Sequence, residues 1–223
     1  MKIDISKYFY TINHDVLKNN LINNLGSDEF NLLCKIIDST NKSYINNIIS
    51  KLEKKHNLIL PKYNYNEGLP IGNLTSQFLA IFYLSKLQHY ILNDLHITYV
   101  NFMDDYVLIH ESKKYLKYSL DIIIEKLEKE YKLKINSKKT FIKNSKGGIT
   151  FLGYLFIVKN NKTIIKITSR AKRNIRKGIK KTRYLYNNNF IDFEKYFCSM
   201  MSYKKGRKYI SQRKINEIIT NIG

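Results

Sequence analysis

The stretch NFMDDYVLIH, residues 101–110, places two acids inside an otherwise apolar part of the chain. Asp104 and Asp105 stand between the largely apolar residues 97–100 and 106–109. Two short runs that are apolar on both faces and joined at the acids are typical of a buried hairpin. Because a carboxylate buried without a partner costs several kcal/mol or takes up a proton, the two acids need a compensating cation.

The composition limits the kind of protein that this sequence encodes. The chain has 223 residues, of which 43% are hydrophobic, enough for one substantial core or two small domains. Its 39 Lys and Arg outnumber its 18 Asp and Glu, which gives a formal net charge of +21. Such an excess favours a polyanionic partner, either nucleic acid or an anionic membrane surface. The alternative is a protein that is basic without such a partner.

Other patterns argue against secretion, zinc binding and membrane insertion. Cys34 and Cys198 lie far apart and form no CxxC pair, which indicates a reducing compartment and hence the cytoplasm. The five histidines lack the spacing of zinc ligands, and the first residues lack the apolar run of a signal peptide. The uncharged run 68–85 contains Pro70 and several polar residues, so it is interpreted as a loop that enters a buried helix.

Apolar periodicity predicts helices and strands along the first 168 residues. Strands are expected at residues 2–10, in the hairpin 97–110, and at 140–143, 149–157 and 163–167, and helices at 13–24, 28–38, 43–56, 74–92 and 113–131.

The composition shifts at residue 169. The last 55 residues contain 15 Lys and Arg and 3 Asp and Glu, a net charge of +12, in a pattern of two or three helices. We therefore expect one domain at residues 1–168 and a second, basic helical domain at residues 169–223.

A third acid, Asp4, lies in the strand-like stretch KIDISKYFY, residues 2–10. If it converged with Asp104 and Asp105, carboxylates within ~4 Å would repel one another by several kcal/mol and would require cations. Magnesium is a hard ion that prefers oxygen ligands and shares them with phosphates. Two such ions held by shared carboxylates stabilise in-line displacement at phosphorus. Together with the basic charge, this predicts phosphoryl transfer on nucleic acid. The alternative is an acidic pair in an exposed turn.

Five segments resemble, in order, the motifs of reverse transcriptases. NFMDDYVLI looks like their aromatic-x-Asp-Asp motif, and KIDISKYFYTINHDVL resembles their first catalytic-aspartate motif. Between these two, GLPIGNLTSQFLAIFYL is similar to the segment that contacts template and nucleotide in bacterial members. INSKKTFI and ITFLGY match the next two motifs of the palm domain. These motifs cover residues 2–154, whereas the tail resembles the family's helical thumb only in length, charge and MSYKKGRKY.

The resemblance implies an α+β fold, in which an antiparallel palm sheet backed by helices (residues 1–168) precedes a helical thumb (residues 169–223). It implies an RNA-directed DNA polymerase that uses two magnesium ions, with manganese as a substitute. The implied partners are an RNA template, a DNA or RNA primer and deoxynucleoside triphosphates, and no membrane. Two alternatives remain: a weak or inactive palm–thumb fragment that only binds nucleic acid, and a non-enzymatic basic protein.

The resemblance also implies roles for the residues of the acidic site. Asp4 and Asp104 would ligate the two metal ions, with Asp105 beside them and the backbone carbonyl of Ile5 on the metal of the nucleotide. Lys139 would be the general acid that protonates pyrophosphate, and a solvated lysine is the alternative.

Nucleotide contacts are implied for four further residues. Phe9 would lie under the incoming sugar as a steric gate; its alternative is an ordinary core aromatic, the role preferred for Tyr8 and Tyr10. Gly72 would permit a close approach of the backbone to the nucleotide, because it lacks a Cβ. Ser76 and Gln77 would open the following helix near the template and the nascent base pair.

Two further sets of residues are expected to hold nucleic acid. The first would grip the primer end from a tight turn, and the second stands at helical spacing in the basic tail. The first set is Phe151, Leu152, Gly153 and Tyr154; the second is Arg173, Arg176 and Lys180.

The sequence also departs from the family pattern. Many relatives have Gln where this chain has Ile71, and Ser-Pro where it has Ser76 and Gln77, which favours the branch of group II introns and diversity-generating retroelements. In the family, the fingers precede the residue that matches Asp4 and supply basic residues to the triphosphate. Since only residues 1–3 precede Asp4 here, we expect residues 1–223 alone to extend a primer poorly. A separate fingers segment or an accessory protein would then complete the site.

Overall fold

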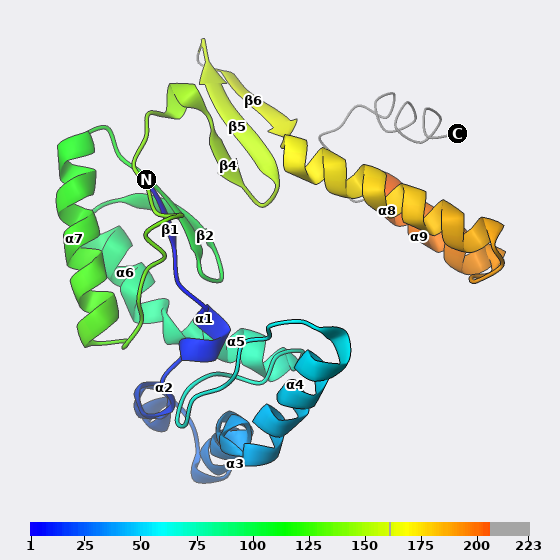
Figure 1. The fold of residues 1–223 in the computed structure, drawn as a ribbon. Coiled ribbons are helices and arrows are strands. Elements are labelled where there is room, and N and C mark those ends of the chain that lie inside the picture. The colour runs from blue at the N-terminus through cyan, green and yellow to red at the C-terminus, as the bar shows by residue number, and fades with distance from the viewer. Residues whose placement is uncertain (161, 206–223) are drawn as a thin grey trace. The chain divides into compact units, whose positions relative to one another are not determined.

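A computed structural model describes residues 1–160 and 162–205 of the chain. The chain divides into two compact units, Met1–Ile142 and Lys143–Gly223. Figure 1 shows the elements of each unit. The division falls before the strands that the sequence analysis grouped with the first domain, because those strands form a sheet of their own. The palm and thumb roles of residues 1–168 and 169–223 stay predictions.

The sheet of the first unit joins segments that are distant in sequence. It consists of β1 (Lys2–Asp4), β2 (Thr98–Phe102) and β3 (Asp105–Ile109), all antiparallel, in the order β1-β3-β2. The pairing of β1 with β3 places Asp4 opposite Asp105. Met103, in the turn between β2 and β3, has a φ of 55°. The register therefore brings the two acidic motifs to the same end of one sheet.

The sequence analysis expected both strands of the hairpin to be buried on both faces, and this is wrong for β2. In β3, Tyr106, Val107 and Leu108 are buried. In β2, by contrast, exposed and half-buried residues alternate, and Val100 and Phe102 are exposed. β3 is the central strand, whereas β2 lies at an edge of this sheet; β1, at the other edge, has an additional bridge to Phe141.

The strand expected at residues 2–10 is correct only as far as Asp4. Lys7 takes a left-handed conformation with a φ of 49°, after which the chain forms the short helix α1 (Tyr8–Thr11). The helical turn buries Tyr8, whose hydroxyl donates to the carbonyl of Ala80. A buried contact with a distant helix therefore outweighs the strand propensity of the aromatic run.

The first unit is otherwise helical. The helix expected at residues 74–92 is in fact two helices, because the chain departs from helical geometry at Leu84 (φ −99°, ψ 5°). The helices and 3-10 turns are α2 (His14–Leu21), η1 (Ile22–Asn24), α3 (Ser27–Ile37), η2 (Asp38–Asn41), α4 (Ser43–His56), α5 (Leu74–Tyr83), α6 (Ser85–Asn93) and α7 (Lys113–Lys129).

The core of the first unit lies between its sheet and the helices α6 and α7, which Figure 1 shows beside the sheet, and continues to α5 and α2. The hydroxyl of Tyr83 is buried there and donates to the carbonyl of Tyr131 at 2.6 Å. The same hydroxyl accepts the N–H of Asn13 at 3.3 Å, so its polar atom is satisfied within the core. The core side chains of these helices include Leu79, Ala80, Leu87, Ile91, Ile123 and Leu127.

The second unit contains a sheet followed by two helices. The turn η3 (Ser145–Gly147) precedes β4 (Ile149–Phe151), β5 (Tyr154–Lys159) and β6 (Lys162–Ile167), which are antiparallel in the order β4-β5-β6. The helices α8 (Ser169–Asn187) and α9 (Phe193–Lys205) follow. A Cβ at Gly178 of α8 would collide with the hydroxyl group of Tyr203 in α9, so the two helices approach closely there.

The named strands of the described residues pair antiparallel in two small sheets, and helices accompany both sheets, which confirms the α+β class. The motif MSYKKGRKY begins in α9 and continues beyond residue 205, outside the described residues. None of the helices in the described ranges combines the length and the apolarity needed to cross a membrane.

Candidate active site

Three acids from two distant segments meet at one end of the first sheet. Asp4 ends β1 and is buried, and Asp105 begins β3 directly opposite it. Asp104 immediately precedes β3, and its backbone carbonyl accepts the N–H of Ile5 at 3.2 Å. The convergence that the sequence analysis considered for Asp4, Asp104 and Asp105 therefore follows from the strand register.

Lys139 forms an ion pair with Asp4. Its Nζ donates to Oδ1 of Asp4 at 3.0 Å and to Oδ2 at 3.3 Å. The backbone positions this lysine, because the N–H of Asn136 donates to the carbonyl of Asp4 at 2.7 Å and the N–H of Lys139 to the carbonyl of Asn136 at 3.0 Å. The side chain of Lys139 is 62% exposed, whereas that of Asp4 is only 13% exposed.

Lys2 forms the second ion pair of the site. Its Nζ lies 2.9 Å from Oδ2 of Asp105, and the two side chains are 15% and 23% exposed. In the register of β1 and β3, Lys2 stands opposite Val107, so Lys2 and Asp105 are diagonal neighbours. Side chains at diagonal positions lie within reach of a long residue such as lysine. The register of β1 and β3 therefore explains why Lys2 and Asp105 form a pair.

Asp104 differs electrostatically from the other two acids. Burial raises its pKa above the usual value, and the charges of Asp4 and Asp105 raise the pKa further. Lys139 lowers the pKa of Asp104, but no salt bridge to Asp104 occurs within residues 1–160 and 162–205. The two lysines thus compensate Asp4 and Asp105, and Asp104 carries the charge that still needs a partner.

The donor set of this site suits a hard divalent cation. Its carboxylates and backbone carbonyls are the oxygen ligands that magnesium prefers. One oxygen, Oδ1 of Asp105, is buried without a hydrogen-bond partner, and Asp104 has a raised pKa that a nearby cation would lower. In the described part of the chain, however, no group of three His, Cys, Asp or Glu side chains is arranged to hold a metal ion. A lysine occupies the oxygens of Asp4 instead.

Phe9 and Gly72, two of the predicted nucleotide contacts, differ in their surroundings. Phe9 lies in α1, half-buried, and packs against the core with an edge-to-face contact to Tyr8. Gly72 has a φ of 96°, and a Cβ there would meet no atom within 4 Å. The backbone conformation therefore favours glycine at this position, and the space around it is open.

Ser76 and Gln77, the other two, point in different directions. Both lie in the first turn and a half of α5, whose N-cap Asn73 accepts the N–H of Thr75 at 3.2 Å. Ser76 is fully buried, and its hydroxyl lacks a hydrogen-bond partner among the described residues. Gln77 is exposed. Of the two, only Gln77 is accessible to a ligand in this arrangement.

The predicted primer-binding residues form a tight hairpin turn in the second unit. Phe151 pairs with Tyr154 at the ends of β4 and β5. Leu152 and Gly153 make the turn between them with φ values of 48° and 82°. Two successive positive φ values are typical of a type I′ turn, which matches the twist of a hairpin. The turn is thus well defined, and its part in binding a primer stays a prediction.

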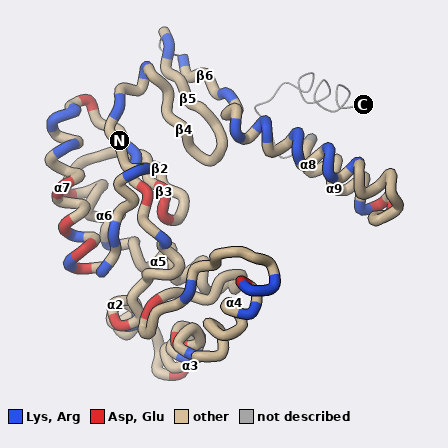
Figure 2. Tube along the Cα trace, in the orientation of Figure 1, with Lys and Arg blue, Asp and Glu red and all other residues tan. Residues whose placement is uncertain are grey.

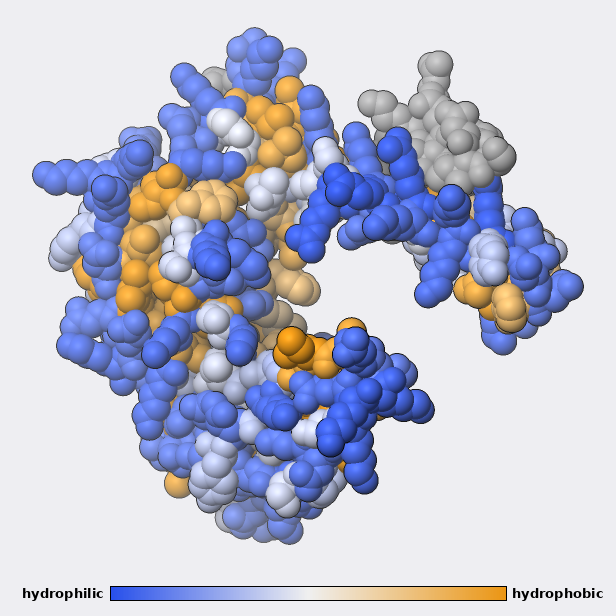
Figure 3. Space-filling model, viewed as in Figure 1, coloured by the Kyte–Doolittle hydropathy of each residue, from blue (hydrophilic) through white to orange (hydrophobic). Residues whose placement is uncertain are grey.

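The predicted nucleic-acid contacts Arg173, Arg176 and Lys180 are exposed on α8. This helix buries Ile175, Ile179 and Thr182, and its sequence holds eight Lys and Arg and no acid. Figure 2 shows basic residues along its length, and Figure 3 shows hydrophilic side chains over it. The second unit therefore presents a basic helical surface.

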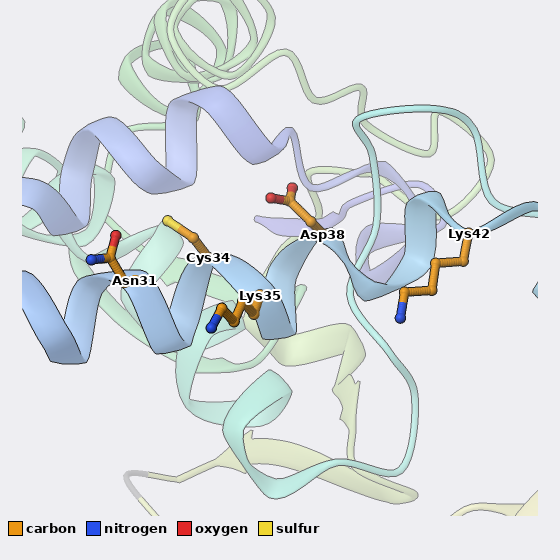
Figure 4. A pocket seen from close by; sticks show the side chains of 5 residues that line it. All are labelled: Asn31, Cys34, Lys35, Asp38 and Lys42. Carbon is orange, nitrogen blue, oxygen red and sulfur yellow. The ribbon is translucent and has the colours of Figure 1, made fainter.

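A separate pocket lies on the first unit along α3 and η2. It is lined by Asn31, Cys34, Lys35, Asp38 and Lys42 (Figure 4). The carboxylate of Asp38 accepts from Lys18 at 2.6 and 2.7 Å. Burial raises the pKa of Cys34, which disfavours the reactive thiolate. None of the predicted site residues lines this pocket.

The sequence analysis did not anticipate the two ion pairs of the acidic site. Lys2 stands two residues before Asp4, so the period of a strand would have placed both on one face. Lys139 stands 135 positions from Asp4, and nothing in the local sequence indicates their contact.

Comparisons with solved structures give two telomerases. The apo telomerase from Candida tropicalis, truncated from its C-terminal domain, is 17% identical with a TM-score of 0.46; the match covers 75% of this chain and 35% of that chain. The telomerase from Candida albicans in complex with a TWJ fragment of telomeric RNA is 12% identical with a TM-score of 0.47. That match covers 99% of this chain and 46% of that chain. This chain thus spans less than half of either telomerase chain.

A comparison with curated proteins found no match. The sequence model of the family described as reverse transcriptase (RNA-dependent DNA polymerase) matches residues 1–156, which include Asp4, Asp104, Asp105 and Lys139. The chain therefore belongs to the reverse transcriptase family.

Proposed function

We propose that this chain is the palm and thumb part of an RNA-directed DNA polymerase. The reaction joins a primer 3′-hydroxyl to the α-phosphorus of a deoxynucleoside triphosphate, and pyrophosphate leaves. The observation that carries this proposal is the antiparallel register that places Asp4 opposite Asp105, next to Asp104, within the segment that matches the family. The residue roles below rest on this convergence and on the sequence motifs.

We assign the metal ligands to Asp4, Asp104 and the backbone carbonyl of Ile5, with Asp105 beside them. Two magnesium ions, or manganese in their place, would activate the attacking hydroxyl and neutralise the triphosphate when bound. Lys139 is the proposed donor of a proton to pyrophosphate. Because its Nζ now contacts Asp4, this role requires the side chain to turn from the carboxylate to the phosphates.

The nucleotide pocket is proposed to lie between α1 and the start of α5. The N–H of Leu69 donates to the carbonyl of Phe9 at 2.8 Å, which ties the loop before α5 to α1. This contact supports a common role for Phe9, Gly72 and Gln77 at the sugar, backbone and base of the nucleotide. Ser76, which is buried, would then support the helix from inside.

The RNA template and its primer are the proposed partners of the second unit. Exposed cations on α8 suit a phosphate backbone, which is recognised by charge and shape and not by sequence. The primer end is assigned to Phe151, Leu152, Gly153 and Tyr154. Selection of the nucleotide then falls to base pairing with the template.

The segment from Ile71 to Gln77 supports the assignment of this chain to the branch of group II introns and diversity-generating retroelements. The proposed location of the protein is the cytoplasm. Lys2 pairs with Asp105, and the single charge of Lys139 does not balance a triphosphate, so further cations are needed. We propose that a fingers segment or an accessory protein supplies these cations.

The test is primer extension on an RNA template with Asp104→Asn and with Asp121→Asn, an exposed acid of α7, as the matched control. We expect Asp104→Asn to abolish magnesium-dependent extension and to leave RNA binding intact. Asp121→Asn should behave as the wild type. Unchanged extension by Asp104→Asn would disprove the proposal. RNA binding without extension by the wild type, even with a fingers segment added, would favour the alternative of a fragment that only binds nucleic acid.

A further inference from the structure

The two lysines of the acidic site hold their partners differently. Lys139 contacts both carboxylate oxygens of Asp4, at 3.0 and 3.3 Å. Of the two carboxylate oxygens of Asp105, Oδ2 accepts from Lys2, whereas Oδ1 is buried without a hydrogen-bond partner among the described residues. The oxygens of Asp4, which a divalent cation would need, are thus engaged by an ammonium group.

The two lysines also differ in their freedom to move. The side chain of Lys139 is 62% exposed, whereas that of Lys2 is 15% exposed. An exposed lysine pair is weak, because solvent screens it and the long side chain loses entropy when it is held. The loop itself is fixed by two backbone hydrogen bonds that do not involve the ammonium group, from the N–H of Asn136 to the carbonyl of Asp4 and from the N–H of Lys139 to the carbonyl of Asn136. The Lys139 side chain can therefore leave Asp4 without any change in the backbone.

We propose that Lys139 is an exchangeable counter-ion of Asp4 that a divalent cation must displace, whereas Lys2 remains the counter-ion of Asp105. This inference rests on the proposed function, since it concerns the metal site assigned there. Lys139 would then neutralise Asp4 in the metal-free site, in addition to its proposed role at pyrophosphate.

The exchange has a clear electrostatic consequence. With Lys2 on Asp105, the carboxylates of Asp4 and Asp104 are the two that remain for cations. Before a cation binds, Lys139 limits the repulsion between these neighbouring carboxylates. When it leaves Asp4, its ammonium group becomes available to the phosphates of an incoming nucleotide. Lys139 therefore sets the affinity of the site for metal.

The experiment measures Mn²⁺ binding to the full chain by electron paramagnetic resonance of the free ion, without nucleotide. We expect Lys139→Met to bind Mn²⁺ about fivefold more tightly than the wild type, because an exposed ion pair no longer competes. Lys139→Arg keeps the charge and should bind less tightly than Lys139→Met. The control is Lys138→Met, which removes the same charge from an exposed neighbour whose backbone N–H, not its ammonium group, is held by Asn136.

A double-mutant cycle with Asp4→Asn tests whether the effect acts through Asp4. Asp4→Asn should weaken Mn²⁺ binding, and adding Lys139→Met should then change nothing further. Thermal unfolding gives an independent readout. Without metal, Lys139→Met should melt below the wild type, and saturating Mn²⁺ should remove the difference.

Three results would overturn the inference. One is a Lys139→Met affinity equal to that of Lys138→Met. Another is an equal tightening by Lys139→Met in the Asp4→Asn background, which would indicate a general charge effect. In both cases Asp4→Asn still weakens binding, so the proposed metal site survives. If Asp4→Asn binds Mn²⁺ as tightly as the wild type, the proposed metal site and this inference fail together.

Discussion

Nζ of Lys2 lies 2.9 Å from Oδ2 of Asp105, although 103 positions separate the two residues in the sequence. The contact crosses from β1 to β3 and is largely shielded from solvent. Of the two adjacent acids Asp104 and Asp105, which both need a compensating cation, Asp105 therefore has a lysine of the same chain as its partner. The other, Asp104, forms no salt bridge within the described residues, and burial, together with the charges of Asp4 and Asp105, raises its pKa.

The Lys2–Asp105 pair should contribute to stability. We expect Lys2→Met to lower the free energy of unfolding by about 1–3 kcal/mol, because it leaves a half-buried carboxylate without its donor. Urea denaturation followed by circular dichroism measures this. Lys129→Met is the control, since its pair with Glu125 is exposed on α7 and should be worth less than about 1 kcal/mol. Equal losses in the free energy of unfolding would mean that the Lys2–Asp105 pair stabilises the fold no more than an exposed pair does.

Asp104→Asn should stabilise the chain in the absence of divalent cations. The charges of Asp4 and Asp105 oppose the charge of Asp104, and burial does so as well, so a neutral amide of similar size relieves both. We expect a higher melting temperature in a chelator-containing buffer. Asp121→Asn should leave the melting temperature unchanged. A lower melting temperature for Asp104→Asn would show that its carboxylate is held by favourable contacts.

Nucleic-acid affinity should depend on the cations of α8. Counterion release gives a slope of roughly −0.7 to −0.9 in log affinity against log salt for each phosphate contacted. The triple change Arg173→Glu, Arg176→Glu and Lys180→Glu should flatten the slope measured by fluorescence anisotropy. The matched control reverses three exposed lysines of α7, Lys113, Lys114 and Lys117. If both triple variants flatten the slope equally, the effect comes from net charge and not from α8.

The turn between β4 and β5 should tolerate asparagine at position 152 but not alanine at position 153. Gly153 has a φ of 82°, so Gly153→Ala places a side chain in a strained backbone conformation and should cost about 1–2 kcal/mol. Leu152, with a φ of 48°, is better suited to asparagine, and Leu152→Asn should keep or raise stability. Thermal unfolding compares the two. A neutral Gly153→Ala would show that this turn can relax to another type.

Residue type and spacing along the chain were enough to predict the acidic motifs and the periodic elements. Residues 113–131 repeat their apolar positions at helical spacing, and the structure has α7 there. The acids and the order of the motifs were evident from the chain alone, and the family match over residues 1–156 agrees with them. These features are local, because helical spacing and residue type do not depend on what the segment packs against.

Which charges lie next to one another could not be predicted from the sequence, because it depends on the packing of distant segments. The strand expected at residues 2–10 ends at Asp4, because Lys7 turns the chain and Tyr8 finds a partner on α5. The register of β1 with β3 then fixes the pairing of Lys2 with Asp105, and the loop at Asn136 brings Lys139 to Asp4. Electrostatic energy depends on the distance between charges in space. Residues more than a hundred positions apart acquire that distance only when the sheet forms.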